Sequence, residues 1–298
     1  MKDGRIPGYV STSAGASAAI WRSGTLRIVG QYKGYPTFLT GVNSSGDAVG
    51  YASVPTKTCC GTPFIQYANG RFSAVPNISN CYDTLDGGGD RPVTINDAGD
   101  VYGTCWRGNE SEAPSAARFA PGTPAFISGS LYGRGGGFGN VNSSGEFAYT
   151  AFLLPAEPKA ASGEGLVAAR VPTGYSFSWA TWINDAGTVV GSATDSTTRK
   201  HIYTYVYPAG GPVKVLPLLG SATSMNPAGI NKYGTIVGGW SDANASSGIF
   251  LYKSGLLYDV TNSITPAGSY SVAATGIADS GAFIGGANGQ YYVIAPVK

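Results

Sequence analysis

A glycine-containing motif that recurs at a nearly fixed interval constrains this chain more than any other feature of its sequence. Each copy has a β-branched residue, a residue that is usually Asn, two variable residues that are mostly small or polar, and then Gly. The copies are residues 42–46, 95–99, 141–145, 183–187, 230–234 and 277–281. The steps between their glycines are 53, 46, 42, 47 and 47 residues. Self-similarity at this period is typical of solenoids and propellers.

Each copy of the motif predicts a β-hairpin, because Asn can cap a tight turn with its side chain and Gly accepts a positive φ. A second hairpin follows, in which two apolar runs flank another Gly, as in residues 249–257. A repeat therefore contains four antiparallel strands, which we call a, b, c and d. Residues 4–9 look like a further copy that lacks strand a, and the last copy shows no strand d.

Four-stranded repeats of this length predict an all-β fold, a β-propeller of four-stranded blades. We expect a single domain over residues 1–298, because the repeat covers the whole chain. Seven copies of strands b and c favour seven blades, and the six copies of strand a leave six blades as the alternative. No segment has the apolar periodicity of an amphipathic helix.

Composition excludes several classes of function. The 19 basic and 17 acidic residues give a net charge of +2, which argues against a nucleic-acid-binding protein with a basic stripe. The sequence contains no window of 18 apolar residues, so it predicts no membrane span. The single histidine, His201, rules out a site of several imidazoles, and its place at the start of a strand c indicates a structural role.

A family resemblance rests on two runs of residues. Residues 216–220, Leu-Pro-Leu-Leu-Gly, and 229–238, Gly-Ile-Asn-Lys-Tyr-Gly-Thr-Ile-Val-Gly, resemble the HAF family of extracellular repeat proteins. Residues 201–203, His-Ile-Tyr, stand where that family has His-Ala-Phe, a triplet that other copies have lost. The resemblance covers nearly the whole chain. It implies a bacterial propeller that is secreted or periplasmic, with its signal peptide removed, and it implies no established activity.

Four cysteines, Cys59, Cys60, Cys81 and Cys105, lie close together in the sequence. Their even number and the absence of Cys-x-x-Cys spacing favour disulfides over a metal site. We predict one bridge from Cys81 to Cys59 or Cys60, and a second from the remaining member of that pair to Cys105. Four reduced thiols are the alternative.

The loops between strands b and c and between strands d and a are long and differ in every repeat, whereas the turns at the other end are short and uniform. Variable loops on a rigid scaffold commonly carry function, so we expect the site on the loop face. A Trp beside an Arg can stack on a planar ligand and bind an anionic group on it. The ligand-binding candidates are Tyr82, Arg91, Trp106, Arg107, Trp179, Trp182, Trp240 and Asp242. The alternative is that these residues pack the loops together.

These features predict a monomeric binding protein for a glycan or another small polar ligand at a cell surface. The alternative is a carbohydrate-active enzyme, a polysaccharide lyase or a glycoside hydrolase, with its site at the mouth of the central channel and with catalytic residues that the sequence does not identify. A scaffold that binds another protein is a third hypothesis. Asp83, Asp86 and Asp90 could bind Ca²⁺, although a solvated turn fits their spacing better. We expect no other metal and no cofactor.

Overall fold

The chain is all-β. The computed structural model describes residues 5–13, 15–22, 24–54, 62–76, 91–105, 115–120, 125–126, 137–150, 159–162, 165–168, 173–264, 271–287 and 290–296. In these residues the one helical segment is the 3-10 turn η2 (Thr261–Ser263). No helix in the described part is long and apolar enough to cross a membrane.

The strands form antiparallel sheets that follow the order of the repeats. The first sheet has three strands, β1 (Arg5–Thr12), β2 (Gly15–Arg22) and β3 (Thr25–Gly30). The second has four, β4 (Thr37–Val42), β5 (Ala48–Ala52), β6 (Thr62–Gln66) and β7 (Phe72–Ala74). The third comprises β8 (Arg91–Ile95), β9 (Val101–Cys105), β10 (Ser115–Ala120) and β11 (Ala125–Phe126). The fourth comprises β12 (Gly137–Val141), β13 (Phe147–Thr150), β14 (Lys159–Ser162) and β15 (Gly165–Ala168).

An eight-stranded sheet follows and consists of two antiparallel halves. Its first half is β16 (Tyr175–Ile183), β17 (Val189–Asp195), β18 (Ile202–Tyr207) and β19 (Lys214–Val215). Its second half is β20 (Ala222–Ile230), β21 (Ile236–Asp242), β22 (Ser247–Lys253) and β23 (Leu256–Asp259). The halves join at one parallel pairing, between Ile202 and Ser224. The last sheet has three strands, β24 (Ser271–Ile277), β25 (Phe283–Ala287) and β26 (Gln290–Ile294).

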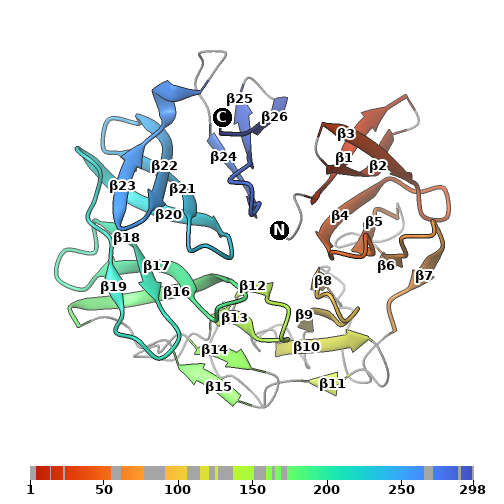
Figure 1. Ribbon diagram of the computed structural model, residues 1–298, viewed down its shortest axis with the longest axis horizontal. Coiled ribbons are helices and arrows are strands. Elements are labelled where there is room, and N and C mark those ends of the chain that lie inside the picture. The colour runs from red at the N-terminus through yellow and green to blue at the C-terminus, as the bar shows by residue number, and fades with distance from the viewer. Residues whose placement is uncertain are drawn as a thin grey trace.

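The sheets stand around a central axis, with the sheets β1–β3 and β24–β26 at the two ends of the series (Figure 1). The innermost strands β4, β8, β12, β16, β20 and β24 each contact the innermost strand of the neighbouring sheet. Among the described residues the first sheet has no strand at this inner position, and β1 contacts β4 directly. The last sheet lacks an outer strand within the described residues. Both features agree with the partial first and last copies of the sequence repeat.

Apolar side chains fill the space between neighbouring sheets. Val49 of β5 and Ile65 of β6 pack with Ile95 of β8, all three with at most 6% of their surface exposed. Val206 of β18 packs with Met225 of β20 in the corresponding layer between the two halves of the eight-stranded sheet. A single antiparallel sheet cannot bury both of its faces, so packing between consecutive sheets stabilises the whole ring.

Candidate ligand site at the turn side of the channel

The six motif turns, five with Asn and the last with Ala278 in its place, lie together at one end of the ring, which we call the turn side. In the turn of residues 184–187, Asn184 Oδ1 accepts hydrogen bonds from the N–H groups of Ala186 at 3.1 Å and Thr188 at 2.9 Å. The N–H of Gly187, whose φ is 72°, donates to the Asn184 backbone oxygen at 3.0 Å. The predicted capping role of the motif Asn is therefore confirmed.

The same asparagines also connect consecutive repeats, which sequence reasoning missed. Asn43 Nδ2 donates to the backbone oxygen of Asn96 at 3.1 Å, although the two residues are 53 positions apart. The equivalent bond recurs later in the ring, from Asn142 to Asn184 at 3.1 Å, from Asn184 to Asn231 at 3.0 Å and from Asn231 to Ala278 at 3.3 Å. Each bond is buried. We call this series the asparagine ladder.

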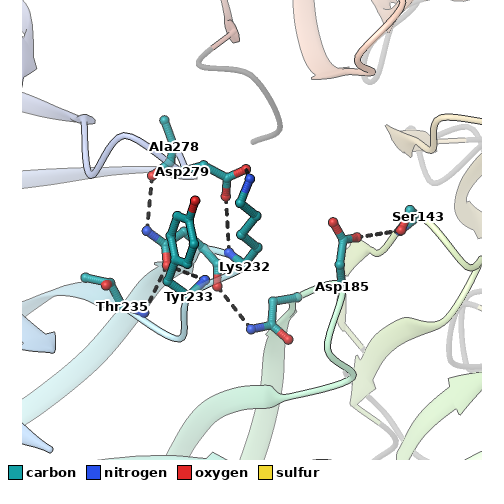
Figure 2. Close-up of polar contacts among 9 residues, drawn as sticks. Ser143, Asp185, Lys232, Tyr233, Thr235, Ala278 and Asp279 are labelled. Carbon is teal, nitrogen blue, oxygen red and sulfur yellow. Dashed lines mark hydrogen bonds and ion pairs between the residues drawn. The ribbon is translucent and has the colours of Figure 1, made fainter. Parts of the chain in front are cut away.

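A second contact between turns involves the residue that follows each Asn. The N–H of Ser44 donates to Asp97 Oδ1 at 2.9 Å, and the N–H of Ser143 donates to Asp185 Oδ1 at 2.9 Å. The N–H of Lys232 donates to Asp279 Oδ1 at 3.2 Å (Figure 2). The turns are thus linked in pairs by an aspartate of the later turn. This pairing follows the sequence, in which Asp occupies this position in the second, fourth and sixth turns.

Lys232 also reaches the same aspartate with its side chain. Its Nζ lies 3.2 Å from Asp279 Oδ2 and 5.0 Å from the centre of the Tyr233 ring. The hydrogen bond and the charge of Asp279 raise the pKa of the Lys232 ammonium. The position at the rim of the ring therefore accommodates a primary ammonium between a carboxylate and an aromatic ring.

A cavity of about 530 Å³ opens within the ring at the turn side. The ends of the innermost strands and the six turns form its wall, together with Pro7 of β1. Trp182 of β16 contributes an aromatic surface. Asp97, Asp185 and Asp279 contribute carboxylates, and Lys232, which pairs with Asp279, contributes an ammonium. A volume of this size is typical of pockets for small ligands or single side chains.

Asn140 holds the wall of the cavity together between β12 and β16. Its Nδ2 donates to the Ile183 backbone oxygen at 3.0 Å, and its Oδ1 accepts from the Ile183 N–H at 2.5 Å. One side chain thus satisfies both backbone groups of a residue in the next sheet. Because Trp182 precedes Ile183 in β16, this contact also fixes the backbone that carries the Trp182 ring.

The turn segments contain more acidic than basic residues, although the chain as a whole is slightly basic. Arg5 and Arg27 add two cations from the first sheet, which donate to backbone oxygens of the first turn. The turn segments 43–47, 96–100, 142–146, 184–188, 231–235 and 278–282 contain one basic residue, Lys232. They contain six acidic residues, Asp47, Asp97, Asp100, Glu146, Asp185 and Asp279. Within the described residues, no group of three or more His, Cys, Asp or Glu side chains could hold a metal ion. The charge of the turn segments therefore favours a cationic over an anionic ligand at this end of the ring.

Of the ligand-binding residues that the sequence predicts, the structure brings Trp182 alone to the wall of this cavity within the described part of the chain. Trp182 lines the cavity and also packs against the layer that contains Val206 and Met225. Trp240 packs against the same layer, and its buried Nε1 has no hydrogen-bond partner in the described part of the chain. The bulky groups of β16 and β21 therefore contribute to packing between sheets.

Asp242 stabilises its own loop. Its Oδ1 accepts from the N–H groups of Asn244 and Ser246, both at 2.9 Å, and its Oδ2 accepts from Ser221 Oγ at 3.3 Å. Loss of hydration opposes ionisation of this carboxyl, but the hydrogen bonds from Ser246, Asn244 and Ser221 outweigh it and lower the pKa of Asp242. A carboxylate held in this way is suited to fixing a loop.

The structure describes only some of the remaining predicted residues. Arg91 is the first residue of β8, opposite Thr104, and Trp179 lies in β16 opposite Ser192. His201 lies beside the Tyr203 ring, with 6.2 Å between ring centres, in keeping with its predicted structural role. The residues outside the described part are Tyr82, Trp106, Arg107, Cys59, Cys60, Cys81, Asp83, Asp86 and Asp90. The loop-face site, the disulfides and the Ca²⁺ site thus stay predictions.

No protein-family model and no curated protein matches the chain. Several solved structures do. The acylaminoacyl peptidase of Pyrococcus horikoshii is similar with a TM-score of 0.60 and 9% identity over 99% of this chain and 50% of that chain. A puromycin-hydrolyzing peptidase of Mycobacterium tuberculosis is similar with a TM-score of 0.58 and 10% identity over 97% of this chain and 52% of that chain. TolB from Acinetobacter baumannii is similar with a TM-score of 0.56 and 12% identity over 85% of this chain and 61% of that chain.

These structures establish the fold. The similarity lies in β-propeller domains, so the predicted β-propeller is confirmed. The chain spans between 50% and 61% of the length of the three proteins named. At 9% to 12% identity, the likeness shows the fold and assigns no ligand or activity of those proteins to this chain.

The predicted glycan-binding function and the alternative of a carbohydrate-active enzyme are wrong by this comparison. The neighbours are TolB-like propellers and the propellers of prolyl and acylaminoacyl peptidases, and not proteins that bind or cleave carbohydrates. The prediction depended on Trp residues as sugar platforms, whereas Trp182 and Trp240 pack between sheets. Large aromatic rings stabilise sheet packing as readily as they bind a ligand.

Proposed function

We propose that this chain is a ligand-binding propeller module that accepts a cationic group in the turn-side mouth of its channel. The observation that carries the proposal is the cavity of about 530 Å³ whose rim bears Asp97, Asp185 and Asp279. The binding group would be the ammonium or guanidinium of a peptide side chain. The aromatic surface of Trp182 would contact the apolar stem that carries it.

Charge supports this choice of ligand. Clefts lined by charges of one sign raise the local concentration of counter-charged ligands and their rate of association. The aspartates of the rim already use some of their oxygens to bind backbone N–H groups, so they are held in place before a ligand arrives. Groups that are fixed in advance lose less conformational entropy on binding.

Lys232 gives a second line of support. Its ammonium occupies a place between Asp279 and the Tyr233 ring, as a ligand ammonium would beside Asp97 or Asp185. The residues that contact Asp97 and Asp185 from the preceding turns are Ser44 and Ser143, which donate backbone N–H groups to them.

The test uses tri-lysine as probe and tri-glutamate as its charge-reversed counterpart, with isothermal titration calorimetry at low salt. We expect tri-lysine to bind and tri-glutamate not to bind. Asp97→Asn and Asp185→Asn keep an oxygen for the Ser N–H and remove one charge each, and each should weaken tri-lysine binding roughly threefold. Asp259→Asn on the outer strand β23 is the control and should have no effect. Equal binding by all four proteins would exclude the channel mouth as the site.

We also propose a seven-bladed ring. The eight-stranded sheet counts as two blades, because a single parallel pairing joins its halves. Membership of the HAF family, a monomeric state and a secreted or periplasmic location are proposals as well, supported by the motif Ile-Asn-x-x-Gly and by the four cysteines.

A further inference from the structure

Several of the innermost strands carry a β-bulge close to their turn. In β4 the pairing with β5 shifts register at Thr40, and in β16 the pairing with β17 shifts at Thr181. In β20 the shift falls at Ala228. Each of these extra residues stands three positions before the motif Asn. Bulges re-aim side chains and are common beside functional sites, so this position can equip the channel wall.

The bulge of β16 brings two neighbouring residues to the same cavity. In a regular strand consecutive side chains point to opposite faces of the sheet. Thr181 and Trp182 are consecutive, yet both line the cavity of about 530 Å³, and both are partly exposed. The wall contributed by β16 therefore combines a hydroxyl group with an indole ring.

The hydroxyl proton of Thr181 is used inside the sheet. Thr181 Oγ1 donates to the backbone oxygen of Val190 at 3.3 Å, and Thr40 Oγ1 donates in the same way to the backbone oxygen of Val49 at 3.2 Å. A hydroxyl group has one proton and two lone pairs. Toward a ligand, Thr181 therefore acts as a hydrogen-bond acceptor, since donation would break its bond to β17.

Other polar groups of the wall also direct their donors into the wall. Ser143 Oγ donates to Asp185 Oδ1 at 2.8 Å (Figure 2). Asn184 Nδ2 donates to the backbone oxygen of Asn231 at 3.0 Å, and Asn140 Nδ2 donates to the backbone of β16. These donors hold the turns and the innermost strands together. The groups that the described wall presents to a ligand are thus mainly acceptors.

A wall of this kind distinguishes between cations. An aromatic ring attracts quaternary and primary ammonium groups alike, and a carboxylate attracts both by its charge. A hydroxyl acceptor binds only a cation that carries an N–H group. A site that is built to bond an N–H rejects an analogue without it, because the polar group of the site is then left unpaired.

We propose that Thr181 and Trp182 determine the specificity of the channel mouth, so that it selects the ammonium of an unmodified lysine side chain over a trimethylammonium group. This inference rests on the proposed function and adds to it the kind of cation. Thr181 Oγ1 accepts an N–H of the ligand, and the Trp182 ring contacts the same group. Lys232 shows a matching combination in this wall, with its Nζ 3.2 Å from an oxygen of Asp279 and 5.0 Å from the centre of the Tyr233 ring.

The probes are tri-lysine with an acetylated N-terminus and an amidated C-terminus, and the same peptide with every Nζ dimethylated or trimethylated. The blocked termini remove the α-ammonium, which would bring N–H groups to every probe. The three peptides carry equal charge, and their binding is measured by isothermal titration calorimetry at low salt. We expect similar affinities for the unmodified and dimethylated peptides. The trimethylated peptide should bind roughly fivefold more weakly, because the third methyl group removes the last N–H.

Three variants locate the determinant. Thr181→Val keeps the branched shape and removes the hydroxyl, so it should bind the unmodified probe as weakly as the trimethylated one. Thr181→Ser keeps the hydroxyl and should keep the preference. Thr223→Val is the matched control and should keep it too. Thr223 is also the extra residue of a bulge in an innermost strand, and it donates to the Ser241 backbone oxygen at 3.3 Å, but it lies at the end of β20 away from the turn.

The outcomes separate this inference from the proposed function. If no probe binds the wild-type protein, the proposed function is overturned and the inference with it. If the three probes bind equally, or if affinity already falls at the second methyl group, the inference alone is overturned and the cation site stands. It is also overturned if Thr181→Val keeps the preference or if Thr223→Val loses it. Loss of the preference in Thr181→Val alone, at a melting temperature equal to that of Thr223→Val, supports it.

Discussion

Arg5 Nη1 lies 3.4 Å from the backbone oxygen of Asn43, to which it donates a hydrogen bond. In the asparagine ladder this backbone oxygen accepts from the Asn of the preceding repeat, as Asn231 O does from Asn184. Within the part of the chain that the structure describes, the first sheet has no inner strand, and Arg5 on β1 supplies the donor. At the other end, Ala278 accepts from Asn231 and has no side-chain amide to pass the ladder on. The series therefore begins at an arginine and ends at an alanine.

Replacing Arg5 with Ala should remove the donor that starts the ladder. We expect a loss of about 1 kcal/mol in the free energy of unfolding, because this partly exposed charged group donates to the backbone oxygens of both Asn43 and Ser44. Hydrogen exchange should become faster in residues 37–47. Lys253→Ala, which removes an exposed cation on β22, is the control. Equal effects of the two variants would show that Arg5 acts through charge alone.

Asn184→Ala should be more costly, because Asn184 is buried and makes bonds within its turn and to Asn231. We expect a loss of about 2–3 kcal/mol, measured by urea unfolding, since buried backbone groups lose their partners. Asn184→Asp keeps the acceptor of the turn and loses the donor to Asn231, so its loss should fall between zero and that of Ala. Asn69→Ala, in an exposed turn, should change stability by less than about 0.5 kcal/mol.

Gly229→Ala should destabilise the packing of β20 against β24. A Cβ at this position would lie 2.5 Å from Gly276 Cα, and neither backbone can move without disturbing its sheet. The expected cost is about 3 kcal/mol from overpacking. Gly239→Ala in β21 is the matched control, since its nearest neighbour would be 3.9 Å away. Similar melting temperatures for the two variants would contradict the close approach of β20 and β24.

Tyr102 should make stability depend on pH at the alkaline end. Burial, aided by the charge of Asp100 and opposed by Arg118, raises the pKa of the Tyr102 hydroxyl to about 12 from an ordinary 10.0. Between these values the unfolded chain loses the Tyr102 proton while the folded chain keeps it, so stability falls as pH rises from about 10 to about 12. Tyr102→Phe removes this proton. Urea unfolding of both proteins across this range should show a shallower decline for the variant.

The four cysteines should give no free thiols in a titration under denaturing, non-reducing conditions. Two bridges that close loops of about 20 and 45 residues would each stabilise the fold by roughly 3–4 kcal/mol in the chain-entropy model. Reduction should therefore lower the melting temperature. Detection of four thiols would instead support the reduced alternative.

The repeat made much of the fold predictable. The motif Asn and Gly act locally, through bonds within a few residues, so the hairpins and their order could be derived from residues 183–187 and their equivalents. The partial first and last repeats likewise predicted the two sheets with three strands. The candidate site was less predictable, because Trp182 can either pack between sheets or face a cavity, and its sequence does not distinguish these roles.

The sequence by itself determined the repeat, the turns and the all-β class, because these depend on backbone preferences and on contacts close along the chain. Tertiary structure alone decided which groups meet across 42 to 53 positions, as Asn142 meets Asn184 and Asn43 meets Asn96. It also decided that aspartates from separate turns surround one cavity and that Ile28 stays exposed. These long-range contacts depend on how the sheets are arranged around the axis. That arrangement results from packing between whole sheets rather than from any one repeat.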